Sequence, residues 1–173
     1  MKFTIRTERK EDYQSIQNVN DLAFGQKNEG KLIGKLRMTK SFIPELSLVA
    51  ESENKIVGHI LFYPVYIRSE EDSHISLALA PMAVHPDYQR KGIGSRLILE
   101  GLSSAKGLGY DSIIVLGHPE FYAMFGFQPA SAWNIKAPFD VPGNAFLAVE
   151  LIDNSLKNVS GTVEYPEEFN VCD

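Results

Sequence analysis

The amino-acid sequence predicts a single α/β (α+β) domain over residues 1–173, with a core of about residues 1–151 and a C-terminal extension over 152–173. Two observations lead to this fold class. First, segments with the spacing of amphipathic helices alternate along the chain with short segments typical of strands. Second, a glycine-containing loop joins an apolar strand that ends at Val84 to an amphipathic helix that begins at Gly92. A chain of 173 residues is also long enough to bury one core.

The N-terminal part is expected to contain one strand and two helices. The strand covers Phe3–Arg6, and a helix over Glu11–Phe24 follows it and ends at Gly25. The apolar positions of this helix recur at helical spacing, at Tyr13, Ile16, Val19 or Asn20, and Ala23. A second, shorter helix covers Glu29–Met38 and is expected to bury Leu32, Ile33 and Leu36.

Three strands connected by polar turns follow in the sequence. They cover Leu46–Glu51, Ile56–Ile67 and His74–Val84. The first turn, Glu53-Asn54-Lys55, is typical of a hairpin, and a second polar turn covers Ser69–Ser73. The last of the three strands contains Pro81, which has no N–H group to contribute to a sheet.

The second half of the chain is expected to begin with the main helix, over Gly92–Leu108. Its apolar face consists of Ile93, Leu97, Ile98, Leu102 and Ala105. Ser112–Leu116 is a short apolar strand, and it should therefore be buried and central. Phe121–Phe125 has the pattern of one or two helical turns, which Gly126 ends. Further strands are expected near Phe127–Pro129, Ala145–Leu151 and Gly161–Tyr165, after which the chain should fray.

The loop Gln89-Arg90-Lys91-Gly92-Ile93-Gly94 has the features of a phosphate cradle. The N–H groups in the first turn of a helix have no intrahelical partner, and the helix dipole attracts anions to that end. Glycine has no Cβ, so the main chain can curl and come close to phosphate oxygens at Gly92 and Gly94. Arg90 and Lys91 add positive charge at the same place.

This loop resembles the acyl-CoA-binding motif of the GNAT superfamily of N-acetyltransferases, Gln/Arg-x-x-Gly-x-Gly/Ala, at Gln89, Gly92 and Gly94. The resemblance covers about residues 1–151, and the ending VELIDNSLKNVSGTVEYP is similar to the YhbS-like branch. It implies a single mixed sheet with helices on both faces, splayed at the cofactor strand near Pro81, and acetyl-CoA or coenzyme A as co-substrate. The implied cofactor-binding residues are Met82, Ala83 and Val84, which would pair with the pantetheine amides, and Gln89, Arg90, Lys91, Gly92, Ile93, Gly94 and Ser95.

A second motif, Phe121-Tyr122-Ala123-Met124-Phe125-Gly126-Phe127, resembles the family's Tyr-x-x-x-Gly-Phe element. The resemblance implies that the Tyr122 hydroxyl lies near the thioester sulfur and protonates the leaving thiolate of coenzyme A. The alternative is that Tyr122 is only a packed ring with a satisfied hydroxyl.

The sequence does not single out a general base that would remove a proton from the attacking amine. His118 follows the strand that ends at Leu116, and Glu120 lies two residues later. Glu29 begins a helix that borders the acceptor pocket in the resembling family. The remaining alternative is that the amine arrives deprotonated and that there is no dedicated base.

The composition argues against nucleic acid and membranes as partners. The net charge of −5 gives no overall positive field for nucleic acid, and no apolar run approaches the ~20 residues of a membrane span.

The only cysteine, Cys172, excludes an internal disulfide, which favours a reducing, cytoplasmic location. The first residues, MKFTIRTERKED, lack a signal-peptide core. We expect a monomer or homodimer without a metal.

The predicted function is transfer of an acetyl group from acetyl-CoA to a primary amine of a small molecule or a protein, by direct attack in a ternary complex. The alternative is a non-catalytic module that binds or senses acyl-CoA. A nucleotide-binding loop is disfavoured, because Ser95-Arg96 follows Gly94 where a P-loop needs Lys-Ser/Thr, and Leu97 replaces the third glycine of the dinucleotide fingerprint.

Overall fold

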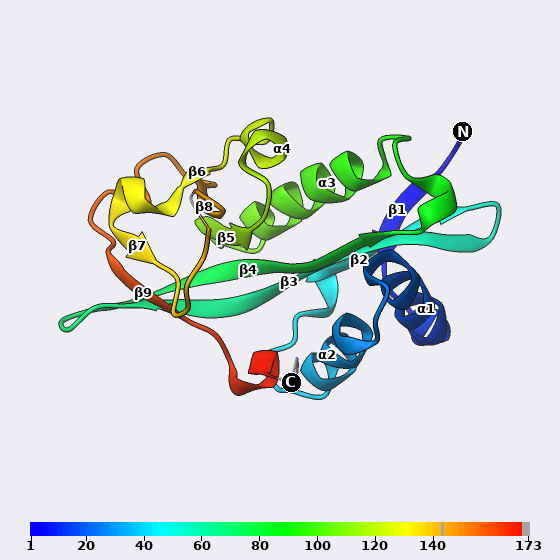
Figure 1. Cartoon of the computed structure of the whole chain (residues 1–173), viewed down its shortest axis with the longest axis horizontal. Coiled ribbons are helices and arrows are strands. Elements are labelled where there is room, and N and C mark those ends of the chain that lie inside the picture. Colours follow the sequence, from blue (N-terminus) through cyan, green and yellow to red (C-terminus); the bar gives the residue numbers. More distant parts are fainter. Residues whose placement is uncertain (143, 171–173) are drawn as a thin grey trace. The chain divides into compact units, whose positions relative to one another are not determined.

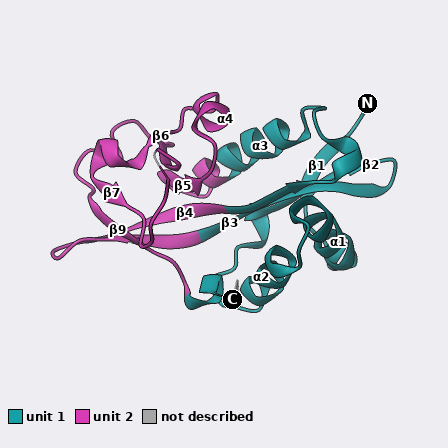
Figure 2. Cartoon of the chain, in the orientation of Figure 1, with its two compact units in different colours: residues 1–63, 80–104, 167–173 teal, residues 64–79, 105–166 magenta. Residues whose placement is uncertain are grey.

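The computed structural model describes residues 1–142 and 144–170. The contacts divide the chain into two compact units (Figure 2). Unit 1 contains residues 1–63, 80–104 and the described residues after 166, and unit 2 contains residues 64–79 and the described part of 105–166. Strands β3 (Lys55–Arg68) and β4 (Ser73–Val84) run from one unit into the other. The expected single domain over the whole chain stays a prediction.

Unit 1 is built on antiparallel strands with three helices. It contains β1 (Thr4–Thr7), α1 (Tyr13–Phe24), α2 (Asn28–Arg37), β2 (Ser47–Ser52), and parts of β3, β4 and α3 (Ile93–Gly107). β2 pairs antiparallel with both β1 and β3. Glu53 and Asn54 have positive φ angles of 50° and 64°, which form the tight turn of the β2–β3 hairpin.

Two consecutive residues of β3 show that helices cover both faces of the strands of unit 1. Successive side chains of a strand point to opposite faces, and Phe62 and Tyr63 are both buried. A Cβ at Gly101 of α3 would overlap the Phe62 ring. Tyr63 belongs instead to a cluster with residues of α1 and α2, namely Ile16, Leu32, Ile33 and Leu36. α3 thus lies on one face and α1 and α2 on the other (Figure 1), as predicted.

The packing of α3 against Phe62 is expected to require glycine at residue 101. Gly101→Ala should lower the free energy of unfolding by about 1–3 kcal/mol, because the added methyl group overlaps Phe62 in a packed core. Gly107→Ala on the same helix is the matched control: nothing lies within 4 Å of its Cβ position, so it should be neutral or slightly stabilising. Urea denaturation measures both. Equal stabilities for the two variants would contradict the tight contact of α3 with β3.

A buried polar network lies beside these strands. The Arg37 guanidinium donates to both carboxylate oxygens of Glu8, at 2.8 and 3.0 Å. The Ser47 hydroxyl donates to the same carboxylate and lies 2.9 Å from His59 Nε2. His59 is fully buried, and its Nδ1 has no partner in the described part of the chain. Burial, and secondly the charge of Arg37, lower the pKa of His59 to about 3.

The lowered pKa of His59 should make the protein sensitive to acid. A histidine that is held neutral in the folded state contributes stability above its unfolded pKa of about 6.5, and this stability is lost as the pH falls toward the folded pKa of about 3. Between about pH 7 and about pH 4.5, the free energy of unfolding should fall by ~2–3 kcal/mol more for the wild type than for His59→Gln. Urea denaturation at the two pH values measures this difference, and parallel losses in both proteins would contradict it.

Unit 2 contains mostly short strands, which pair both parallel and antiparallel. It holds parts of β3 and β4, then β5 (Ser112–Leu116), α4 (Pro119–Ala123), β6 (Gln128–Pro129), β7 (Ile135–Lys136), β8 (Phe146–Glu150) and β9 (Gly161–Glu164). β4 runs parallel to β5, with Leu77 opposite Ile113, and β8 runs antiparallel to β5. The described strands form one mixed sheet in the order β1-β2-β3-β4-β5-β8-β6, with β9 beside β3 and β7 beside β9. The predicted mixed sheet is confirmed.

The structure departs from the predicted elements mainly near the C-terminus. The predicted fraying after Tyr165 is wrong for the described residues, because Glu167–Asn170 forms a 3-10 helix and Phe169 packs edge-on against Tyr63. Leu156 and Val163, from the expected extension, are fully buried in unit 2. Cys172 lies outside the described residues. The splay at β4 stays a prediction, since Met82–Val84 and β5 belong to different units.

Candidate functional site

A short turn at the end of β4 leads the chain toward α3 within unit 1. The His85 N–H donates to the Val57 carbonyl at 2.8 Å, which ties the end of β4 to β3. One 3-10 turn, Pro86–Tyr88, follows, and the Asp87 N–H donates to His85 Nδ1 at 3.1 Å. The His85 ring also packs edge-on against Tyr88, with centroids 5.5 Å apart. His85 therefore caps the turn.

The loop after this turn presents unpaired N–H groups. Arg90 and Gly92 have positive φ angles of 64° and 83°, and Lys91 between them does not. Such alternation makes successive N–H groups converge on one side, as in anion-binding nests. The first helical bond of α3 runs from the Arg96 N–H to the Gly92 carbonyl at 3.1 Å. Among the described residues, no acceptor receives the N–H groups of Gly92, Ile93, Gly94 and Ser95.

The side chains around the loop fix its backbone to the strand. Gln89 Nε2 donates to the Val84 carbonyl at 3.1 Å, so this side chain holds the loop against the strand end. Ile93 is 1% exposed and packs toward Gly58, which leaves only its backbone for a ligand. A Cβ at Gly94 would lie 3.6 Å from Met82 Cε, so Met82 faces the start of α3.

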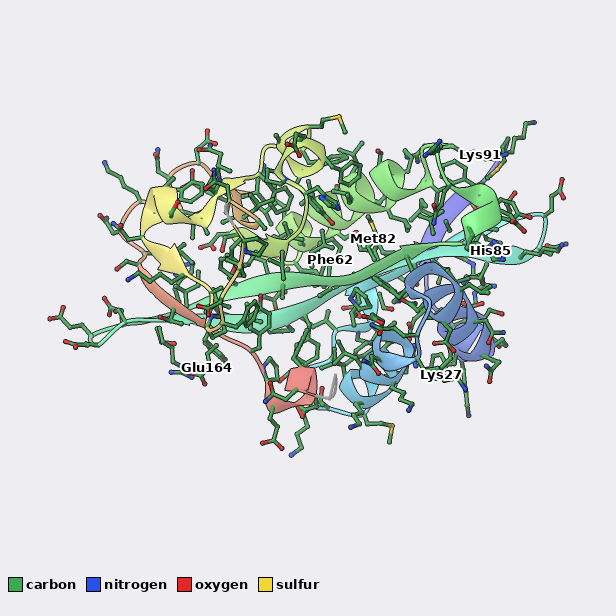
Figure 3. All side chains as sticks on the ribbon, viewed as in Figure 1. Lys27, Phe62, Met82, His85, Lys91 and Glu164 are labelled. Carbon is green, nitrogen blue, oxygen red and sulfur yellow. The ribbon has the colours of Figure 1, made fainter. Side chains whose placement is uncertain are left out.

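The charge at this end of α3 is positive and not neutralised. Arg90 and Lys91 are exposed, and neither makes an ion pair with a described residue. Arg96, one turn into the helix, pairs with Glu100 at 3.3 Å. Figure 3 labels Met82 on β4, and His85 and Lys91 on the two segments that follow the strand. Unpaired N–H groups, the positive end of the dipole of a 15-residue helix and two free cations together suit a diphosphate.

Tyr122 lies in unit 2, on α4. It is 8% exposed, and its ring packs edge-on against Phe121 and Phe127, with centroids 5.1 and 5.4 Å away. Its hydroxyl has no hydrogen-bond partner among the described residues, and it is not one of the fully buried unpartnered atoms, so it reaches the surface. Burial raises the pKa of Tyr122 to about 12. The phenol is therefore a protonated hydrogen-bond donor near neutral pH.

The three candidates for a general base differ in their surroundings. Gln26 Nε2 donates to both carboxylate oxygens of Glu29 at 3.0 Å in unit 1. His118 and Glu120 are exposed on either side of Pro119 at the start of α4 in unit 2, and their side chains make no hydrogen bond to a described residue. None of the three side chains makes an ion pair with another described residue.

One functional candidate was missed by the sequence analysis. Gly117, between β5 and α4, lies directly against the Tyr122 ring. The sequence signal was a glycine between the end of an apolar strand and a helical turn, but the contact itself depends on the fold.

Two further observations concern metals and membranes. Within residues 1–142 and 144–170, no cluster of three or more His, Cys, Asp or Glu side chains could hold a metal ion. No helix in the same residues is long and apolar enough to span a membrane.

Comparison with known proteins identifies close relatives. The family described as Acetyltransferase (GNAT) domain matches residues 44–129. The Escherichia coli (strain K12) protein "Uncharacterized N-acetyltransferase YjhQ" is 40% identical over 141 residues, which cover 81% of this chain and 78% of that protein. A crystal structure of the Escherichia coli GNAT family N-acetyltransferase YhbS in complex with CoA has a TM-score of 0.88 and 32% identity, covering 98% of this chain and 93% of that one. A Brucella melitensis GNAT family acetyltransferase in complex with acetyl-CoA has a TM-score of 0.79 and 31% identity, covering 97% and 98%.

Proposed function

Because this chain belongs to the GNAT family of acetyltransferases, we propose that it transfers the acetyl group of acetyl-CoA to a primary amine of a small molecule or a protein. The observation that carries the proposal is the set of N–H groups at the start of α3, which no described residue accepts, beside two cations that form no ion pair with a described residue. It is supported by the two relatives with 31–32% identity whose crystal structures contain CoA or acetyl-CoA.

Backbone groups of the loop and of β4 would bind different parts of acetyl-CoA. The N–H groups of Gly92–Ser95 would receive the diphosphate, with Arg90 and Lys91 adding charge from the loop. The backbone of Met82–Val84 would pair with the pantetheine amides by strand addition. Gln89 would act indirectly, because its amide holds the loop to the Val84 carbonyl.

Tyr122 would act where the bond between carbonyl carbon and sulfur breaks. Acetyl-CoA, when bound, supplies a thioester whose carbonyl carbon the amine nitrogen attacks directly. The Tyr122 hydroxyl would donate its proton to the sulfur that leaves and would then regain a proton from water. Its raised pKa of about 12 keeps the phenol protonated near neutral pH before the reaction. The proton of the amine would leave to Glu29, His118 or Glu120, or the amine would arrive deprotonated.

The alternative, a non-catalytic module that binds acyl-CoA, is less well supported, because the relatives are named N-acetyltransferases. Release of thiol from acetyl-CoA in the presence of a panel of amines separates the two. We expect amine-dependent thiol release matched by an equal amount of acetylated amine. Tight binding of coenzyme A without thiol release, for any amine in the panel, would support the alternative.

The single cysteine suits a reducing compartment, and we propose that the enzyme is cytoplasmic and is a monomer or homodimer.

The two loop cations are expected to contribute to affinity through local electrostatics. Replacing Arg90 and Lys91 together with glutamine should raise the KM for acetyl-CoA several-fold at low salt and leave kcat unchanged, because the charges act on phosphate and not on the thioester. The matched control replaces the exposed Lys40 and Lys106 with glutamine, which removes the same charge elsewhere. Steady-state kinetics at low and high salt test this. An unchanged KM at low salt would mean that the two side chains do not act on the ligand.

A further inference from the structure

The Tyr122 ring lies against a position where only glycine fits. A Cβ at Gly117 would overlap Tyr122 Cε2 and would lie 3.0 Å from Tyr122 Cδ2. Carbon atoms in good packing are about 3.5–4.0 Å apart, so a methyl group here would displace the ring by about 1 Å. The other sides of the ring are occupied by Phe121 and Phe127, with centroids 5.1 and 5.4 Å away.

The backbone on both sides of this contact is tied down. The Gly117 N–H donates to the Ala145 carbonyl at 2.9 Å, next to the pairing of Leu116 with Phe146. The Tyr122 N–H donates to the His118 carbonyl at 3.2 Å, and the Tyr122 carbonyl accepts from Phe125 at 3.0 Å. Because the backbone is hydrogen-bonded at both residues, a side chain at residue 117 would displace the Tyr122 ring and not the main chain.

We propose that Gly117 is a positioning residue, which sets the direction of the Tyr122 hydroxyl by leaving no side chain beneath the ring. The inference rests on the proposed role of Tyr122 in acetyl transfer. A displacement of about 1 Å in a reacting group can lower a rate by about 10²-fold. Gly117 thus fixes the hydroxyl without touching the substrate.

The test compares wild type, Gly117→Ala, Tyr122→Phe and the double variant Gly117→Ala/Tyr122→Phe. Gly117→Ala should lower kcat by about 10²-fold and change the Kd of coenzyme A less than about twofold. In the Tyr122→Phe background, the same substitution should lower kcat no further, because the hydroxyl that it displaces is absent. The matched control is Gly109→Ala in unit 2, which carries backbone strain at a φ of 96° but meets nothing within 4 Å and should keep the wild-type kcat.

A second readout does not depend on activity. The phenol of Tyr122, followed by ultraviolet difference titration against Tyr122→Phe, should titrate near its buried pKa of about 12 in the wild type. In Gly117→Ala the displaced phenol, titrated against the double variant, should ionise at lower pH, because it is less buried. A wild-type titration together with wild-type kcat in Gly117→Ala would overturn the proposal. An equal fall of kcat in the Tyr122→Phe background would overturn it as well.

The failure of this inference can be told from the failure of the proposed function. If wild-type protein releases no thiol with any amine, the function fails, and the titration still shows whether Gly117 holds the ring. If Gly117→Ala does not fold, the same substitution in a Tyr122→Leu background should fold as well as Tyr122→Leu alone, because leucine removes the overlapping ring. A double variant less stable than Tyr122→Leu would overturn the proposed contact.

Discussion

Replacing Tyr122 with phenylalanine should lower kcat by about 10²–10⁴-fold with any accepted amine. The substitution keeps the ring that packs against Phe121 and Phe127 and removes only the hydroxyl. Because that hydroxyl has no partner among the described residues, its loss breaks no hydrogen bond of the fold, and thermal stability should change little. The affinity for acetyl-CoA should also remain close to that of the wild type. Pre-steady-state and steady-state kinetics together measure the chemical step.

The role of the Tyr122 hydroxyl also has consequences for the pH dependence of kcat and for a control variant. Burial raises the pKa of Tyr122 to about 12, so the hydroxyl stays protonated and kcat should show no loss from its ionisation below about pH 11. Tyr110→Phe, which removes a hydroxyl elsewhere in unit 2, should keep the wild-type kcat. If Tyr122→Phe has the wild-type kcat while chemistry limits the rate, Tyr122 is only a packing residue.

Placing a negative charge in the loop should weaken the binding of coenzyme A strongly. Gly92 has a φ of 83°, a conformation that asparagine and aspartate tolerate better than other residues with side chains, and nothing lies within 4 Å of its Cβ position. Gly92→Asp and Gly92→Asn therefore have the same size and similar backbone strain and differ in charge. The Kd of coenzyme A should be about 10–100-fold higher for Gly92→Asp than for Gly92→Asn, since repulsion between nearby charges at a protein surface is worth about 1–3 kcal/mol.

Isothermal titration calorimetry at low salt measures this pair of variants. Added salt should reduce the difference, because it screens exposed charges. Gly25→Asp is the control: Gly25 is an exposed glycine with a φ of 67° at the end of α1, and this substitution should leave the Kd unchanged. Equal affinities of Gly92→Asp and Gly92→Asn for coenzyme A would show that no phosphate lies near residue 92.

The parts of the fold that the sequence predicted well have a strong local signal. The strand Ser112–Leu116 was predicted with its observed bounds, because four consecutive apolar residues lie between Ser112 and a glycine. The helix predicted over Gly92–Leu108 differs by one residue at each end from the observed Ile93–Gly107. By contrast, the two-residue strand Ile135–Lys136 is too short to show any period, and it was missed.

Contacts between distant residues could not be predicted from local patterns. The helix expected over Phe121–Phe125 begins instead at Pro119, whose fixed φ favours the first helical position. The packing of Phe169 on Tyr63 joins residues far apart in the chain, so the polar C-terminal segment gave no sign of it. The role of Gln89 at the cofactor stays a prediction, and the hydrogen bond from its side-chain amide to the Val84 carbonyl depends on the folded loop and could not be predicted from the sequence. The loop itself was predicted because glycine spacing and helix position are both visible in the sequence.

The proposed function requires that the N–H groups at the start of α3 bind the diphosphate of coenzyme A. Amide proton–nitrogen correlation spectra of the wild-type protein, titrated with coenzyme A, test it most directly. We expect large shifts for Gly92, Ile93, Gly94 and Ser95 with coenzyme A, and much smaller ones with pantetheine, which lacks the diphosphate. Gly25, whose N–H donates to the Asp21 carbonyl at 2.9 Å, should not shift. Binding of coenzyme A that leaves the amide signals of Gly92–Ser95 unchanged would contradict the proposed diphosphate site.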